Sequence, residues 1–251
     1  MHEIAMQKMS EEFFACWRAA CMHADRQVDG GISTWLRALP YPPFLEHFSF
    51  RLGNQLFFVR VVDVDGEVPG PGSIDGLLMV AEGTGGHACM MPMKRHRGGE
   101  WRADGPGWGL VDARSGSPVD PVALVSDERI EMTPWEVHDM AVQVVRQHLE
   151  GQGVEVATWQ GNPAVDPSIW IERESGTLEW IVVRVARHPA RAIERPANWD
   201  AIAASTSRHG KAGHFAPVFL CSGEQPFDSE DEPAAPLWRG HRILIRFEGL
   251  E

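Results

Sequence analysis

The chain of 251 residues has few cysteines, almost no lysine and no long hydrophobic run. No Cys-x-x-Cys pair occurs, so buried free thiols are the expected state of Cys16, Cys21, Cys89 and Cys221. No apolar run approaches the roughly 20 residues of a membrane-spanning helix, and no basic-then-apolar leader is present. These features predict a protein of the reducing cytoplasm that does not enter a membrane.

Positive charge is also scarce. The chain has 23 Lys and Arg against 35 Asp and Glu, and its formal net charge is −12. The deficit is spread evenly, with 12 basic and 17 acidic residues up to Ile130 and 11 and 18 from Glu131 onward. Neither half has the positive field that supplies most nonspecific nucleic-acid affinity, so a nucleic-acid ligand is disfavoured. An acidic body suits a basic protein partner, and it also suits plain solubility.

A change of character near residue 130 predicts an N-terminal α+β domain over 1–130 and a C-terminal α/β domain over 131–251. In the first, Ser10 caps a helix that Asp29-Gly30-Gly31 ends, and a mostly antiparallel sheet follows. The remaining expectations there are an extended connector at Pro40, Pro42 and Pro43, a hairpin over 47–65, a loop over 64–74, short strands over 77–81 and 88–93 joined by Gly83-Thr84-Gly85-Gly86, and long turns over 96–120. The Gly-rich run lacks the Lys-Ser/Thr and helix that a P-loop needs.

The second half opens on a strong helix start. Thr133-Pro134-Trp135-Glu136 has a Thr N-cap, a first-turn Pro and the Glu of a capping box. The pattern then predicts strands over 154–159, 168–172 and 178–185, a short helix that Pro196 and Asn198 open, strands over 215–221 and 241–247, and an acidic loop over 224–233 between these last two strands.

This order of helix, three strands, helix and strands over residues 133–247 resembles the core of the PD-(D/E)XK nuclease superfamily. In that family a helix often carries an acid, an Asp opens the second strand, and a Glu-x-Lys lies on the third. Glu136 and Asp166 are similar to the first two, and Val182-Val183-Arg184 stands where the Glu-x-Lys is expected. The resemblance implies a divalent metal held by carboxylates, and Val182 cannot supply one.

Two interpretations of these residues follow. In a divergent magnesium-dependent nuclease the catalytic candidates are Glu136, Asp166 and Arg184, with Glu172 or Glu174 as a migrated acid. Glu179, the nearest acid, lies on the opposite strand face from Arg184 and cannot join it without a bulge. In the structural interpretation Glu136 serves its capping box, Asp166 is a turn residue, and Arg184 pairs with Asp166, Glu136 or a ligand.

The Gly-containing stretch His209-Gly210-Lys211-Ala212-Gly213-His214 has no zinc spacing but suits a flexible ligand loop. The binding candidates are therefore Arg184, His209, Lys211 and His214, with no metal or cofactor expected outside the magnesium alternative. The function that we expect is non-catalytic binding of a basic protein on a degenerate nuclease-like scaffold. Immunity proteins that neutralise nuclease toxins are acidic for the same electrostatic reason. A duplication of one fold in the two halves has no support from residue-level periodicity.

Overall fold

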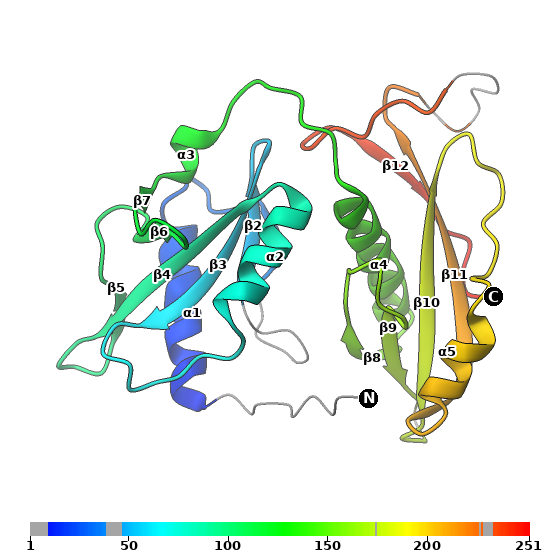
Figure 1. Cartoon of the computed structure of the whole chain (residues 1–251), viewed down its shortest axis with the longest axis horizontal. Helices are drawn as coiled ribbons and strands as arrows, with labels where there is room; N and C mark the ends of the chain where they lie inside the picture. The colour runs from blue at the N-terminus through cyan, green and yellow to red at the C-terminus, as the bar shows by residue number, and fades with distance from the viewer. Residues whose placement is uncertain (1–9, 39–46, 174, 226, 228–232) are drawn as a thin grey trace. The chain divides into compact units, whose positions relative to one another are not determined.

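The structure is a computed structural model that describes residues 10–38, 47–173, 175–225, 227 and 233–251. The chain divides into two compact units, Met1–Arg129 and Ile130–Glu251. Each unit combines helices with one β-sheet, which confirms the predicted α+β class (Figure 1). Within the described ranges no helix is long and apolar enough to cross a membrane. The predicted proline connector and most of the predicted acidic loop lie outside these ranges.

Unit 1 contains a seven-stranded sheet in the order β1-β2-β3-β4-β6-β7, with β5 also paired to β4. The β3–β4 pairing is parallel and the others are antiparallel. Its elements are α1 (Glu11–Asp25), β1 (Thr34–Arg37), β2 (Phe48–Leu52), β3 (Gln55–Asp63), α2 (Ile74–Thr84), β4 (His87–Arg95), β5 (Trp101–Ala103), β6 (Leu110–Asp112), β7 (Pro118–Val119) and α3 (Pro121–Leu124).

The predicted first helix and the hairpin of unit 1 are confirmed. Ser10 caps α1 by accepting a hydrogen bond from the Phe13 amide, and Gly53-Asn54 joins β2 to β3. Helix α1 packs against one sheet face, where Trp17 meets Phe48 edge-on, and α2 covers the other face (Figure 1). The four cysteines, all of them described, form no disulfide, and burial raises the pKa of Cys16 and Cys89 to about 12.

The predicted strand over 77–81 is wrong, because these residues belong to helix α2. Ser73 accepts a hydrogen bond from the Gly76 amide as the N-cap, and Leu77 and Ala81 are buried one helical turn apart. A short apolar run does not distinguish a strand from a buried helix by periodicity alone. Here the parallel β3–β4 pair requires a crossover connection, and α2 provides it.

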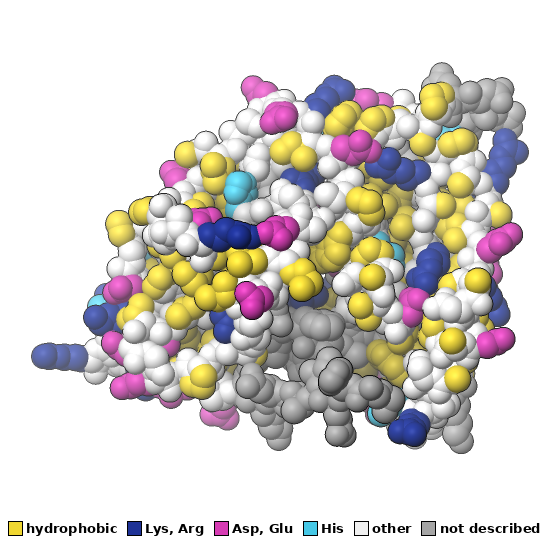
Figure 2. Space-filling view, viewed as in Figure 1, with side chains coloured by type: hydrophobic (Ala, Val, Ile, Leu, Met, Phe, Trp, Pro, Cys, Tyr) yellow, Lys and Arg dark blue, Asp and Glu magenta, His cyan; other side chains and the backbone are white. Residues whose placement is uncertain are grey.

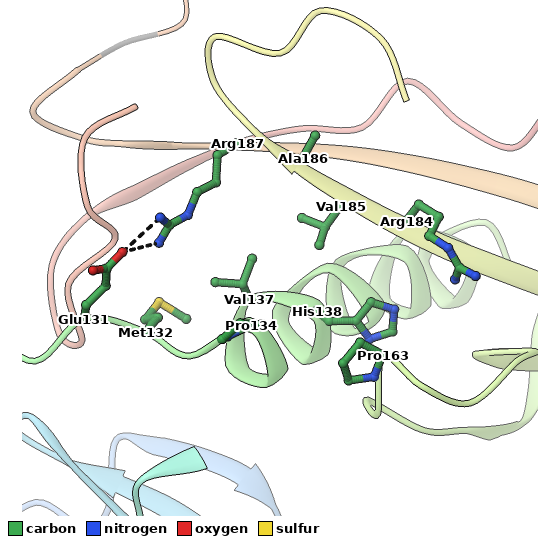
Figure 3. Close-up of a pocket in the computed structure, with 10 residues that line it drawn as sticks. All are labelled: Glu131, Met132, Pro134, Val137, His138, Pro163, Arg184, Val185, Ala186 and Arg187. Atoms are coloured by element: carbon green, nitrogen blue, oxygen red, sulfur yellow. Dashed lines mark hydrogen bonds and ion pairs between the residues drawn. The ribbon is translucent and has the colours of Figure 1, made fainter. Parts of the chain in front are cut away.

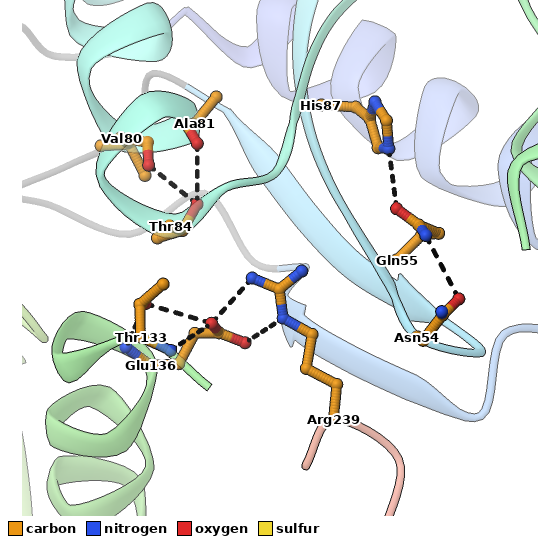
Figure 4. Close-up of polar contacts among 9 residues, drawn as sticks. All are labelled: Asn54, Gln55, Val80, Ala81, Thr84, His87, Thr133, Glu136 and Arg239. Atoms are coloured by element: carbon orange, nitrogen blue, oxygen red, sulfur yellow. Dashed lines mark hydrogen bonds and ion pairs between the residues drawn. The ribbon is translucent and has the colours of Figure 1, made fainter. Parts of the chain in front are cut away.

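The Gly83-Thr84-Gly85-Gly86 run ends this helix and does not hold a phosphate loop. Gly85 takes the left-handed conformation of a C-cap, with φ of 57°. The Thr84 hydroxyl donates to the carbonyls of Val80 and Ala81 (Figure 4). A side chain at Gly86 would collide with the Phe58 ring, 2.7 Å from its added Cβ. The predicted turns over 96–120 hold the short strands β5, β6 and β7.

Unit 2 contains a five-stranded sheet in the order β12-β11-β10-β9-β8. The β10–β11 pairing is parallel and the rest are antiparallel. The elements follow the predicted order and are α4 (Pro134–Gly151), β8 (Glu155–Trp159), β9 (Ile169–Glu172), β10 (Leu178–Arg187), α5 (Trp199–Thr206), β11 (Gly210–Ser222) and β12 (Ile243–Arg246).

The two faces of the unit 2 sheet are covered by different helices (Figure 1). On one face, α4 buries an aliphatic core in which Val145 contributes with Ile181 and Val183 of β10. On the other, Ile202 of α5 packs with Trp180 and Val182. Since side chains alternate along a strand, odd-numbered residues of β10 face α4 and even-numbered ones face α5. This alternation decides which candidate residues can meet.

Candidate functional site

Arg184 and Asp166 form a closed ion pair. Arg184 lies near the end of β10, and its Nη1 and Nη2 donate to Oδ1 and Oδ2 of Asp166 at 2.9 and 2.6 Å. The Arg184 side chain is 25% exposed and that of Asp166 is 13% exposed. Nη1 also donates to the Val183 carbonyl. The prediction that Arg184 must be paired is confirmed, with Asp166 as the partner.

The segment that carries Asp166 is fixed from several sides. Gly161 lies so close to helix α4 that an added Cβ would stand 1.9 Å from Oδ1 of Asp139. Gln160 accepts from the Asn162 amide at 2.7 Å and donates to the Pro167 carbonyl at 3.4 Å. Ser168 then joins the β10 edge, because its amide donates to Ile181 and its hydroxyl accepts from the Val183 amide. These bonds hold the Asp166 carboxylate opposite Arg184.

The position at which the nuclease resemblance expects an acid is part of the apolar core. Val182 has no exposed surface and packs between Trp180 and Ile202 beneath α5. An ionised carboxylate at this place would lose its hydration without gaining a partner among these apolar neighbours. The apolar surroundings of residue 182 therefore suit the valine that is present and not the acid that the nuclease motif has there.

Both carboxylate oxygens of Glu136 accept hydrogen bonds from neighbouring residues of unit 2. Its Oε2 accepts from the Thr133 amide and hydroxyl at 2.9 and 3.1 Å, which completes the capping box (Figure 4). Arg239 donates to both Glu136 oxygens, through Nε and Nη2, at 2.8 Å each. The side chains are 7% and 2% exposed, so this is a buried bidentate pair. These contacts agree with the structural interpretation, in which Glu136 serves its capping box.

Glu179 lies on the opposite face of β10 from Arg184, as the strand alternation predicts. Its Oε2 accepts from Arg173 Nε at 2.9 Å and lies 2.8 Å from Nε2 of His214. Hydrogen bonding from Arg173 lowers the pKa of Glu179 below its usual value, and the bond with His214 adds to this effect. His214, a binding candidate, is thus paired within the sheet.

The expectation of a flexible ligand loop over 209–214 is wrong, because β11 begins at Gly210. Its glycines are needed for close packing: an added Cβ at Gly213 would lie 2.1 Å from the Trp180 ring, and one at Gly210 would lie 2.6 Å from the Leu178 carbonyl oxygen. The rings of His209 and Trp170 form a T-shaped pair whose centroids lie 6.4 Å apart. The Lys211 side chain lies outside the described part of the chain.

Of the two acids proposed to migrate into a metal site, the structure describes Glu172. Glu172 is exposed at the end of β9, where it pairs in register with Leu178 of β10. Glu174 lies outside the described residues. Among the described residues, no three His, Cys, Asp or Glu side chains converge in an arrangement that could hold a metal ion.

A pocket of about 650 Å³ lies beside the Asp166–Arg184 pair, between the first turns of α4 and the end of β10 (Figure 3). Its charged lining residues are Arg184, Arg187 and Glu131. Its apolar lining comes from residues before and within α4, from β10 and from the loop before β9, namely Met132, Pro134, Val137, Val185, Ala186 and Pro163. This volume is in the range of small-molecule sites.

Two polar groups of this pocket were not identified from the sequence. Buried His138 places Nδ1 at 2.9 Å from the Gly161 carbonyl oxygen and Nε2 at 3.3 Å from that of Val183. Arg187 donates from both Nη1 and Nη2 to Oε1 of Glu131, at 2.9 Å each. The sequence holds a signal for each residue. His138 follows Pro134 by one helical turn, and Arg187 follows Val183 on the same strand face, so His138 and Arg187 lie at one end of the core.

The class that the fold defines is an α+β protein with a mixed sheet in each unit and a polar-rimmed pocket in unit 2. Residues 135–251 match a family described as a domain of unknown function, DUF8840. The match covers α4 from its second residue and the whole sheet of unit 2. The Asp166–Arg184 pair lies within it, and so do the pocket-lining residues other than Glu131, Met132 and Pro134. Curated proteins and solved structures give no match to this chain.

Proposed function

We propose that the chain is a non-catalytic binding protein that captures a basic protein partner. The observation that carries the proposal is the bidentate contact between Arg184 and Asp166. In the nuclease interpretation this carboxylate would bind a cation, whereas here a guanidinium already occupies both of its oxygens. The apolar surroundings of Val182 and the engagement of Glu136 by Arg239 support the same proposal.

The preference for a basic partner rests on charge. A net charge of −12 attracts a basic protein over distances longer than a contact and speeds its capture. On the face shown in Figure 2, acidic and basic side chains are interspersed with apolar ones, which supports a protein interface more than a nucleic-acid one. By analogy of charge, immunity proteins that neutralise nuclease toxins are one kind of protein with this behaviour.

Metal titration tests the non-catalytic part of the proposal. Magnesium and manganese are titrated into the wild-type chain and into Asp166→Ala by calorimetry, and cleavage is assayed on plasmid DNA and structured RNA. We expect no site-specific metal binding and no cleavage by either protein. Metal binding and cleavage that Asp166→Ala abolishes would establish the divergent nuclease instead.

Salt dependence tests the partner. The immobilised full chain is incubated with lysate of its source organism at low and at high salt, and retained proteins are identified. We expect a stoichiometric partner of basic isoelectric point whose retention falls as salt rises, because exposed charges are screened within about 10 Å at 0.1 M salt. A partner that is acidic, or that binds equally at both salt concentrations, contradicts the proposal.

A further inference from the structure

We propose that the pocket between α4 and β10 is a binding site for a carboxylate-bearing ligand with an apolar body, and that Arg187 is its anchoring residue. This site goes beyond the proposed capture of a protein partner. It is carried by the different states of the two pocket arginines, by the stretch of the β10 edge that lies beyond the β9–β10 ladder, and by the apolar surface that separates the arginines.

The two arginines are held to different degrees. Arg184 donates to both oxygens of Asp166, and that carboxylate is 13% exposed, so the pair forms a fixed end of the pocket. Arg187 donates twice to a single oxygen of Glu131, and the side chains are 32% and 48% exposed. Ion pairs in contact with solvent contribute about 0–1 kcal/mol, so another carboxylate can replace that of Glu131 at small cost.

Glu131 itself shows which chemistry the Arg187 fork accepts. Its carboxylate already receives two N–H groups from Arg187 at 2.9 Å. A ligand carboxylate that takes both donors with two oxygens would make the planar bidentate contact that guanidinium favours. Two of the three charged lining residues are arginines within a chain of net charge −12, so the local charge favours an anion.

The backbone of β10 adds donors at the same place. The β9–β10 ladder ends at Ile181, and Val183 uses its amide and carbonyl for Ser168 and His138 on that edge. By the alternation of a strand, Val185 directs its N–H and C=O to the same edge, beyond the end of the β9–β10 ladder. The edge thus presents polar backbone groups to the pocket that Val185 lines.

An apolar surface lies between the two arginines. In Figure 3 the side chains of Val137 and Val185 lie between Arg187 at one end and Arg184 at the other. Met132 and Pro134 extend this wall on the Glu131 side. A ligand that places its carboxylate on Arg187 therefore lays its remaining atoms over aliphatic groups, which release water when they are covered. An aliphatic carboxylic acid and the C-terminal carboxylate of an extended peptide share this chemistry.

The test uses octanoate, octanamide and butanoate as probes, titrated into the full chain by calorimetry at millimolar concentrations. We expect octanoate to bind, octanamide to bind at least tenfold more weakly, and butanoate more weakly than octanoate because it covers less of the wall. Equal binding of octanoate and octanamide, or no binding of octanoate together with the peptide acid below, overturns the proposal.

Three variants then separate Arg187 from general charge effects. Arg187→Gln should weaken octanoate binding about tenfold or more, since a charge-assisted contact is lost. Glu131→Gln should strengthen it roughly twofold to fivefold, because the internal competitor loses its charge. The matched control is Arg114→Gln, which removes an exposed arginine paired with Glu82 in unit 1 and should change nothing. Equal affinities for Arg187→Gln and Arg114→Gln contradict the assignment.

The source of the carboxylate is decided by a second pair of probes, an acetylated Ala-Ala-Leu peptide with a free or an amidated C-terminus. Tighter binding of the free-acid peptide than of octanoate identifies a polypeptide C-terminus, because the peptide also pairs with the β10 edge. Tighter binding of octanoate identifies a small carboxylic acid. Both outcomes support the site, and a probe that binds equally well as acid and as amide refutes it.

Discussion

The two units differ in where their ion pairs lie. In unit 1 the described ion pairs are at the surface, as in Arg102–Glu100, whose side chains are 63% and 68% exposed. Unit 2 has exposed pairs too, such as Arg187–Glu131, but its Arg239–Glu136 pair lies in the interior, with side chains 2% and 7% exposed. Exposed pairs contribute little to stability, whereas a buried pair makes each partner dependent on the other. Unit 2 is therefore the part of the chain in which a single charge deletion should do most damage.

The two cores differ in the same sense. The unit 1 core is rich in aromatic rings. The Phe50 ring stacks on those of Phe57 and Trp108, with centroid-to-centroid distances of 5.1 and 6.0 Å. The unit 2 core between α4 and the sheet is mainly aliphatic, and polar groups lie at its margins. Stability in unit 1 is thus spread over many apolar contacts, while unit 2 combines a core with obligatory polar pairs.

The largest effect that separates the units is expected from Arg239→Met. This change leaves the Glu136 carboxylate buried without its bidentate partner, and removal of one member of such a pair typically costs about 3–5 kcal/mol. We expect the free energy of unfolding of unit 2 to fall by about this amount while unit 1 is unaffected. Urea unfolding followed by hydrogen-exchange mass spectrometry reports peptides of the two units separately.

Two further variants make this comparison sharp. The double variant that carries Glu136→Gln and Arg239→Met removes both charges. It should therefore recover a large part of the stability that Arg239→Met alone loses. Arg114→Met in unit 1 removes an exposed partner of Glu82 and should cost less than about 1 kcal/mol. A loss of similar size in Arg114→Met and Arg239→Met would show that burial does not distinguish the two units.

A smaller effect is expected from Gly213→Ala. This change tests the close packing of β11 against Trp180, in the stretch where the sequence predicted a ligand loop. The new methyl group would collide with the Trp180 ring, 2.1 Å from the added Cβ, and overpacking of this kind costs about 1–3 kcal/mol. The matched control is Gly151→Ala at the end of α4, where nothing lies within 4 Å and a better helix former should be neutral or slightly stabilising. Thermal unfolding measures both; equal Tm values would refute the close contact.

The Gly213 contact illustrates why part of the fold was predicted and part was not. Local signals with a direct physical cause were interpreted correctly: the Ser10 cap, the Thr133 capping box and the Gly53-Asn54 turn. The loop over 209–214 was wrong because glycine signals either backbone freedom or a close approach, and the approaching Trp180 is 33 positions away in sequence. The strand predicted over 77–81 failed for a similar reason, since the parallel pairing that demands a helix is not local.

The candidate site was predicted to a similar extent. Strand alternation correctly separated Glu179 from Arg184, and the rule that an arginine in an apolar strand needs a partner correctly led to Asp166. Arg239 and Arg187 were missed because their partners are 103 and 56 positions away. No periodicity links residues at such separations; only the folded sheet brings them together.

The smallest effect is a pH dependence expected from His47, which reverses the contrast between the units. His47 is a buried ionisable residue of unit 1 whose Nδ1 has no hydrogen-bond partner in the described structure. Burial, together with the nearby Arg37, lowers the pKa of His47 from 6.5 to about 3. Between these values the unfolded chain binds a proton that the folded chain does not, so stability falls as pH drops below about 6.5 and stops falling near 3.

From these two pKa values, the wild-type chain should lose on the order of 1 kcal/mol of stability through His47 between pH 8 and pH 5.5. His47→Phe keeps an aromatic ring beside Phe58 and cannot titrate, so its stability should decrease by that much less over the same interval. Replacement of the exposed His241 by Phe is the control, and it should leave the wild-type pH dependence unchanged. Urea unfolding at both pH values, followed through unit 1 peptides, measures the difference. Parallel pH dependences for wild type and His47→Phe would mean that the imidazole is protonated in the folded state, and unit 1 would then share the reliance of unit 2 on buried charge.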